Sequence, residues 1–287
     1  MISPDKIIIG TANFNQKYGI LKNKLNYRNI DKVLNFSKKK KIKFIEFSKD
    51  YNSLKLKSKN FQKNFKSFKK IDLQDKYFST GNTNDKILEY LFEKKKYNSC
   101  YGVTIRRPNL LLKTKGKKIF HLLNQLKKNK KISKIGITIY DTKNLNSIIK
   151  KFKIDFIQLP YNFLNYEVFN KTKKLIQRKK IEIHLRSIFL QGLLLKKNYE
   201  LPLELKKLSK YWLYIDNYLD SIGTNRYAAC LNFAINSGAD KLIVGIDNVD
   251  QLKQIFKVKI LKKKIKKFTI KEKKLIDPIY WLKFHKK

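Results

Sequence analysis

The sequence predicts a (β/α)8 barrel that forms a single domain over residues 1–287. Eight short apolar runs follow one another along the chain, and stretches with helical periodicity lie between them. Apolar strands that alternate with helices indicate parallel strands covered on both faces. Eight such units within 287 residues match a closed barrel better than an open sheet. No glycine-rich linker or low-complexity segment divides the sequence.

The expected strands are apolar runs rich in β-branched and aromatic residues, such as KIIIGTANF near the start and SKIGITIY near the middle. In chain order they cover residues 6–14, 43–48, 76–82, 100–108, 133–140, 155–162, 181–189 and 240–246.

The expected helices repeat apolar residues every three to four positions within otherwise polar, lysine-rich stretches. They cover residues 29–41, 83–96, 142–152, 169–180, 203–219 and 224–236. One more amphipathic helix is expected at the C-terminal end, over about residues 270–284.

The chain carries 67 Lys and Arg against 22 Asp and Glu, a formal net charge of +45. A charge of this size attracts polyanions, so non-specific binding to them in vitro is expected. However, only six of the basic residues are arginines, and surfaces that recognise nucleic acids favour arginine over lysine. We therefore expect a lysine-rich, solvated surface and no specific nucleic-acid partner.

Several other classes of protein and site are not expected. The sequence has no run of 18 apolar residues and no secretory signal, so we expect a cytoplasmic protein without a membrane partner. Cys100 and Cys230 are expected to pack in the core, and His184 is expected to be a structural histidine on a strand. No residues are spaced as metal ligands.

In a barrel of this kind the functional residues follow the C-terminal ends of the strands. Five segments at such positions read IIIGTANFNQKYGI, SKIGITIYD, DFIQLPYNFLN, IEIHLRSIFLQGLLL and DKLIVGIDNVDQL. In this order they resemble the aldo/keto reductase superfamily, especially a branch found among bacterial nucleotide-sugar and surface-glycan enzymes. The resemblance implies hydride transfer between NADPH or NADH and a small aldehyde or ketone, sugar-derived or otherwise polar.

The resemblance also assigns catalytic positions, for which the family uses an aspartate, a tyrosine, a lysine and a histidine. Glu46 falls at the aspartate, and Tyr51, five residues later, falls at the tyrosine that donates the proton. Gly81 falls at the lysine and Arg106 at the histidine. Because an unperturbed phenol has a pKa of about 10, a cation must lower it for proton transfer near neutral pH. We expect Arg106 to supply that charge to Tyr51.

The cofactor positions implied by the resemblance lie at the ends of the fifth to eighth strands. They are Thr138, Gln158, Asn162, Arg186, Gln191, Gly192, Leu193, Gly245, Asp247, Asn248 and Gln251. Arg186 falls where many relatives stack an aromatic ring on the nicotinamide, and a guanidinium plane can stack in the same way. The family resemblance slightly favours NADPH, but Asp247 and Asp250 would oppose its 2′-phosphate, so both nucleotides stay open.

Gly81 and Arg106 leave three interpretations of the chain. It is an aldo/keto-type oxidoreductase with an altered site, or a cofactor- or ligand-binding barrel that has lost turnover. In the second case Arg106 would form an ion pair with Glu46 in a relic site. A polyanion-binding protein is the third interpretation, and the oligomeric state is not predicted.

Overall fold

The computed structural model describes residues 2–14, 17–20, 26–48, 64–74, 82–92 and 100–281. Eight parallel strands pair in sequential order, and β1 also pairs with β8, which closes the barrel. The strands are β1 (Ile7–Gly10), β2 (Phe44–Ser48), β3 (Lys66–Asp72), β4 (Cys100–Arg106), β5 (Ile132–Thr138), β6 (Phe156–Pro160), β7 (Glu182–Arg186) and β8 (Lys241–Gly245). The predicted (β/α)8 barrel is therefore confirmed.

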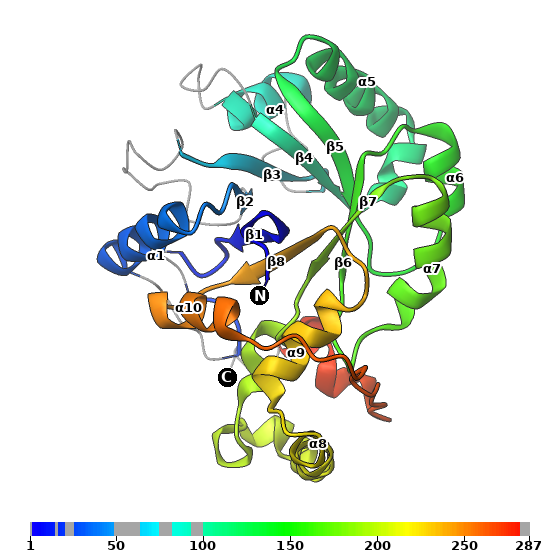
Figure 1. The fold of residues 1–287 in the computed structure, drawn as a ribbon. Coiled ribbons are helices and arrows are strands. Elements are labelled where there is room, and N and C mark those ends of the chain that lie inside the picture. The colour runs from blue at the N-terminus through cyan, green and yellow to red at the C-terminus, as the bar shows by residue number, and fades with distance from the viewer. Residues whose placement is uncertain are drawn as a thin grey trace.

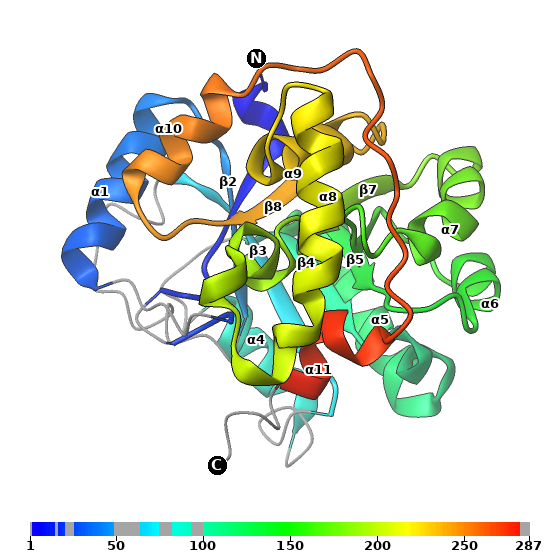
Figure 2. The same cartoon turned by 90° about the horizontal axis from the view of Figure 1, so that it is seen from below.

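Helices surround the strands on the outside of the barrel (Figure 1). They are α1 (Tyr27–Lys39), α4 (Thr83–Phe92), α5 (Thr114–Lys128), α6 (Leu145–Lys151), α7 (Glu167–Arg178), α8 (Ser209–Ser221), α9 (Arg226–Ile235), α10 (Val249–Lys257) and α11 (Pro278–Trp281). Helices α8 and α9 both lie between β7 and β8 in the chain, and they pack next to each other (Figure 2).

The strands bury both of their faces. Side chains that point outward, such as Ile7 and Ile9, join the large core beneath the helices. Side chains that point inward form a second cluster within the barrel, with Ile8, Phe68 and Phe156 among its members. This explains why the strands read as continuous apolar runs rather than alternating ones.

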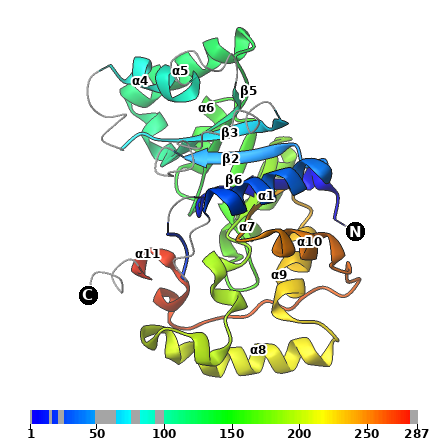
Figure 3. The same ribbon diagram turned by 90° about the vertical axis from the view of Figure 1, so that its left-hand side faces the viewer.

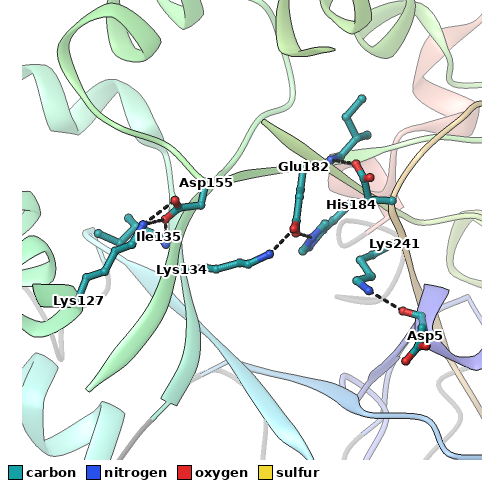
Figure 4. Close-up of polar contacts among 10 residues, drawn as sticks. Asp5, Lys127, Lys134, Ile135, Asp155, Glu182, His184 and Lys241 are labelled. Carbon is teal, nitrogen blue, oxygen red and sulfur yellow. Dashed lines mark hydrogen bonds and ion pairs between the residues drawn. The ribbon is translucent and has the colours of Figure 1, made fainter. Parts of the chain in front are cut away.

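A polar cluster lies inside the barrel near the N-terminal ends of the strands (Figure 4). Lys134 donates a hydrogen bond to the Glu182 carboxylate, and His184 Nε2 lies 3.2 Å from Glu182 Oε2. Burial lowers the pKa of the His184 imidazole, which is therefore neutral and donates to Glu182. The ring stacks on Phe156 at 4.6 Å between centroids. His184 is thus a core histidine, as predicted.

The third strand differs from the prediction. We expected residues 76–82, but the barrel uses Lys66–Asp72, and residues 75–81 lie outside the described part of the chain. The lysines of this segment make it read as a polar stretch in the sequence, although most of the strand is buried. Lys69 Nζ donates to the carbonyl oxygens of Tyr90 (3.2 Å) and Leu91 (3.0 Å) in the last turn of α4, so its burial is compensated.

The C-terminal segment also differs, because no continuous helix runs over residues 270–281. Residues 258–272 contain no helix and run past α8 towards α11 (Figure 2). Phe268 anchors them, with its N–H donating to Phe163 O at 2.9 Å. A 3₁₀ turn (Lys273–Ile276) and α11 follow, separated by Asp277 in an extended conformation. Proline disfavours helical geometry in the residue before it, so Pro278 interrupts the amphipathic pattern.

The ends of the described chain lie on opposite sides of the molecule. Figure 3 shows the N-terminal strand entering the barrel from one side and α11 lying on the other. The strands therefore present their C-terminal ends towards the side of α11, where barrels of this kind place functional residues.

Candidate active site

A cavity of about 170 Å³ opens at the C-terminal ends of β1, β7 and β8. Its walls bring together residues that are far apart in the sequence. Those that matter for the chemistry are Glu46, Lys70, Arg186, Gln191, Asp247 and Gln251. A cavity at this end of a barrel is where ligands bind in this fold.

A chain of buried polar groups crosses the barrel below this cavity. Lys70 Nζ lies 2.9 Å from Glu46 Oε1, and both residues are less than a tenth exposed. Gln158 Nε2 donates to Glu46 Oε2 at 2.5 Å, and Thr138 Oγ1 donates to Gln158 Oε1 at 3.3 Å. Removing one member of a buried ion pair typically costs about 3–5 kcal/mol, so these contacts hold the Lys70 ammonium group firmly at the cavity wall.

Lys70 is a lysine of the third strand, β3, that sequence analysis did not single out. Its ion pair with Glu46 joins β3 to the neighbouring strand β2 inside the barrel. Gly81, which sequence analysis placed at the family's lysine position, lies outside the described residues. Tyr51 also lies outside the described residues.

Arg106 ends β4 and does not pair with Glu46 as one alternative required. Its Nη1 lies 3.5 Å from Asp72 Oδ2, at the end of the neighbouring strand. Arg107 approaches the other oxygen of the same carboxylate, with Nη1 at 3.3 Å from Asp72 Oδ1. Two guanidinium groups therefore share Asp72 at the rim of the barrel.

The β1 and β8 ends are tied together by a network around Asp247. Asn13 Nδ2 donates to Asp247 Oδ1 at 2.7 Å and to Ile246 O at 2.9 Å. Gln251 Nε2 donates to Asp247 Oδ2 at 3.2 Å. Asn248 caps the N-terminus of α10 by accepting from Gln251 N at 2.9 Å. The start of α10 is thus fixed beside the cavity, and a helix N-terminus favours an anionic ligand.

The loop after β7 meets the loop after β1 at close range. Ile20 N donates to Gln191 O at 3.1 Å. Gly19 has φ of 75°, and a Cβ there would lie 2.8 Å from that same carbonyl oxygen, so the approach requires glycine. Gln191 and Gly192 both have positive φ values, of 52° and 89°. Their backbone forms part of the cavity wall.

The cavity includes some of the predicted cofactor residues and not others. Arg186, Gln191, Gly192, Gly245, Asp247 and Gln251 line it. Thr138 and Gln158 belong to the buried chain below. Asn162 is fully buried, with Nδ2 donating to Ser187 O at 3.0 Å and Oδ1 accepting from two backbone N–H groups. Leu193 is buried in the core, and Asn248 caps the N-terminus of α10. Contact of these residues with a cofactor stays a prediction.

Tyr140 lies at the end of a predicted strand, where this fold places functional residues, but the family resemblance gave it no role. It follows β5, and the Arg186 guanidinium carbon lies 4.6 Å from the centre of its ring. Burial raises the pKa of the Tyr140 phenol, but the charges of Arg186, Arg106 and Lys70 lower it more, so that its pKa falls below the ordinary value. Its position directly after a strand was the available signal, but every strand end carries polar or aromatic residues.

Two other sequence-based expectations concern what is absent. Within the described ranges, no group of three or more His, Cys, Asp or Glu side chains is arranged to hold a metal ion. No helix of the described residues is long and apolar enough to cross a membrane. Both cysteines are buried thiols in the core.

The family model of the aldo/keto reductases matches residues 112–276, more than half of the chain. The chain belongs to the aldo/keto reductase family. None of the curated proteins matches the sequence. Aldo/keto reductases are oxidoreductases that bind a nicotinamide cofactor and carbonyl substrates, and the predicted family is confirmed.

Solved structures of aldo/keto reductases share the fold at low identity. A glycerol dehydrogenase of Gluconobacter oxydans is 14% identical, with a TM-score of 0.67 over 96% of this chain and 90% of that one. The holo form of an aldo-keto reductase of Bacillus halodurans is 15% identical, with a TM-score of 0.61 over 86% and 89%. An aldo/keto reductase of Brucella melitensis is 14% identical, with a TM-score of 0.56 over 96% and 94%. At these identities the likeness concerns the fold alone.

Proposed function

We propose that this aldo/keto reductase reduces a small polar aldehyde or ketone, such as a sugar-derived carbonyl, with a nicotinamide cofactor. The observation that carries the proposal is the buried Lys70–Glu46 ion pair at the cavity wall, with 2.9 Å between Nζ and Oε1. A buried cation beside a reaction centre stabilises negative charge that develops on a carbonyl oxygen.

The residues around the cavity suit a nicotinamide dinucleotide. When bound, the reduced nicotinamide supplies a hydride to the carbonyl carbon. The start of α10 and the loop at Gln191 and Gly192 would hold the phosphate groups. Arg186 offers a guanidinium plane in the cavity, on which the nicotinamide ring could stack.

Tyr51 is the proposed proton donor, on the basis of its spacing from Glu46 in the sequence. The proton would pass from the phenol oxygen to the carbonyl oxygen as the hydride reaches the carbon, which yields an alcohol. A neighbouring Lys70 ammonium group would lower the pKa of that phenol. Lys70 therefore takes the role that we first gave to Arg106, which stands in the place of the family's histidine.

For the choice of nucleotide, we propose NADH over NADPH. Asp247 lines the cavity, and its two carboxylate oxygens are fixed by Asn13 and Gln251. By the family's arrangement this loop takes the adenosine end of the cofactor, where a fixed carboxylate would repel a 2′-phosphate and accept hydrogen bonds from a 2′-hydroxyl.

The proposal is tested by titrating the protein with NADH and NADPH, followed by stopped-flow measurement of hydride transfer to a panel of aldehydes and keto sugars. We expect micromolar binding, tighter for NADH, and a loss of about 100-fold or more in kcat for Lys70→Met and for Tyr51→Phe. Lys171→Met is the matched control, because Lys171 is an exposed lysine on α7. Binding weaker than millimolar, or unchanged turnover in both site variants, contradicts the proposal.

One observation favours a second candidate, a barrel that binds the cofactor without turnover. Arg106 occupies the histidine position and is paired with Asp72. Tight nucleotide binding without hydride transfer to any compound of the panel would favour this candidate. Turnover that Tyr51→Phe abolishes would eliminate it.

A further inference from the structure

Three arginines gather at the rim of the barrel beside the cavity. Arg106 and Arg107 share one carboxylate, that of Asp72. Arg186 forms no ion pair with any described residue, and its one hydrogen bond to a described side chain joins Nη1 to Ser187 Oγ at 3.3 Å. The carboxylate of Glu46 is already occupied by Lys70 and Gln158. Among the residues that the structure describes, the rim therefore holds more positive than negative charge.

Tyr140 lies near two of these arginines. Arg186 stacks on its ring at 4.6 Å, and the charge of Arg106 acts on its phenol group. The Tyr140 side chain is 48% exposed, so this row of groups faces the opening rather than the core. The three cations nearest to it also lower the pKa of its phenol, with Arg186 contributing most.

Arg186 has hydrogen-bond donors that no described residue uses. Its Nε and Nη2 atoms are buried and have no hydrogen-bond acceptor among the described residues. Leaving a charged donor buried without an acceptor is unfavourable. A guanidinium group presents paired N–H donors that match the oxygens of a carboxylate or a phosphate.

We propose that the substrate of this enzyme carries an anionic group, a carboxylate or a phosphate, which Arg106 and Arg186 bind on either side of Tyr140. This inference rests on the proposed function, because it places the anionic group next to the carbonyl that is reduced. Lys70 lines the same cavity as Arg186, so the carbonyl would lie towards the Lys70–Glu46 pair and the anionic group towards the rim.

The test uses carbonyls matched in shape and different in charge. One pair is 4-carboxybenzaldehyde and 4-formylbenzamide, and the other is glyceraldehyde 3-phosphate and glyceraldehyde. We expect kcat/KM to be at least tenfold higher for the anionic member of at least one pair, and the pair that shows it distinguishes carboxylate from phosphate. Equal values within both pairs would overturn the inference, although the proposed function would stand.

Variants then decide whether the rim arginines cause the preference. Arg106→Gln and Arg186→Gln should each lower the anionic-to-neutral ratio of kcat/KM at least tenfold. Arg178→Gln is the control, because Arg178 is exposed at the end of α7, on the opposite side of the barrel. A preference that survives in both rim variants would come from the overall charge and would overturn the inference. So would an Arg186→Gln variant that weakens only NADH binding, since Arg186 would then belong to the cofactor site.

A binding measurement covers the case in which no carbonyl is reduced. Benzoate, phenyl phosphate and benzamide are titrated into the NADH-loaded protein and followed by calorimetry. Tighter binding of an anion than of benzamide, lost in Arg106→Gln and kept in Arg178→Gln, would support the anion site while the proposed function failed. Equal binding of all three compounds would overturn the site as well.

Discussion

Glu182 is a half-buried carboxylate inside the barrel that receives hydrogen bonds from two side chains. His184 and Lys134 lower the pKa of this carboxyl to about 2, with the hydrogen bond from His184 as the larger cause. The group's stabilising contribution is therefore complete above its unfolded pKa of about 4.3. It is lost as the pH falls from there towards 2, because the unfolded chain then binds a proton that the folded chain does not.

We predict that Glu182→Gln lowers the free energy of unfolding by about 1 kcal/mol at pH 7, less than for a fully buried charged hydrogen bond because Glu182 is partly exposed. Urea unfolding of this variant and of the wild type should be measured between pH 7 and pH 3. The difference between their free energies of unfolding should shrink below about pH 4.3. Glu204→Gln, which removes an exposed carboxylate, is the control. A difference that stays constant over this range would mean that Glu182 does not titrate as described.

Single residues also show how far the site could be predicted. The spacing from Glu46 to Tyr51 and the loops after β7 and β8 follow from short patterns in the sequence, and the cavity includes the expected Arg186, Asp247 and Gln251. Lys70 was not predictable in this way. In a chain with 67 basic residues, nothing local distinguishes a lysine that pairs with a buried carboxylate on a neighbouring strand from one in solvent.

At the scale of elements, β4 and β5 each carry a glycine where an aromatic ring of the inner cluster needs space. A Cβ at Gly136 would lie 2.4 Å from Phe156 Cε2, and one at Gly102 would lie 2.4 Å from Phe68 Cδ1. The rings of Phe68 and Phe156 meet edge to face at 5.2 Å. The inner cluster therefore depends on small residues on one strand and large residues on the next.

We expect Gly136→Ala to destabilise the barrel by about 1–3 kcal/mol, the usual cost of overpacking a core. The second change Phe156→Leu should recover part of that loss, because it removes the atoms that the new methyl group contacts. Gly245→Ala serves as the control, since a Cβ there meets nothing within 4 Å. Thermal or urea unfolding of Gly136→Ala, Phe156→Leu, the double variant and the control measures the coupling between the two positions. If the losses in unfolding free energy of the two single variants simply add up in the double variant, this packing is contradicted.

Seven strands follow from the sequence, because runs rich in apolar residues at this spacing fit few folds other than a barrel. The third strand and the C-terminal segment do not, and the reason in both cases is tertiary. Lys69 is buried only because α4 offers it two carbonyl oxygens. The amphipathic pattern of residues 270–281 is satisfied without a long helix, because Ile270, Leu275 and Trp281 are each buried against the barrel and its helices.

At the scale of the whole molecule, the net charge is +45, and almost all of the basic residues behind it are lysines. Lysines occur on every described helix except α9 and α11. A field of this kind raises the local concentration of any anion around the protein. It would attract an anionic substrate and a dinucleotide alike, but it does not fix where or in which orientation they bind. The rim arginines and the start of α10 are the groups that would fix the position of a bound anion.

We predict that the protein binds duplex DNA without regard to sequence and only at low salt. Each lysine–phosphate contact releases counterions, so the logarithm of the binding constant should fall linearly with the logarithm of salt concentration, with a loss of about 100-fold or more between 50 and 200 mM NaCl. Fluorescence anisotropy with several 20-base-pair duplexes of different sequence and one heparin fragment measures this. A duplex held 100-fold more tightly than the others at 200 mM NaCl would require direct contacts to bases, and the charge would then have to be interpreted as a recognition surface.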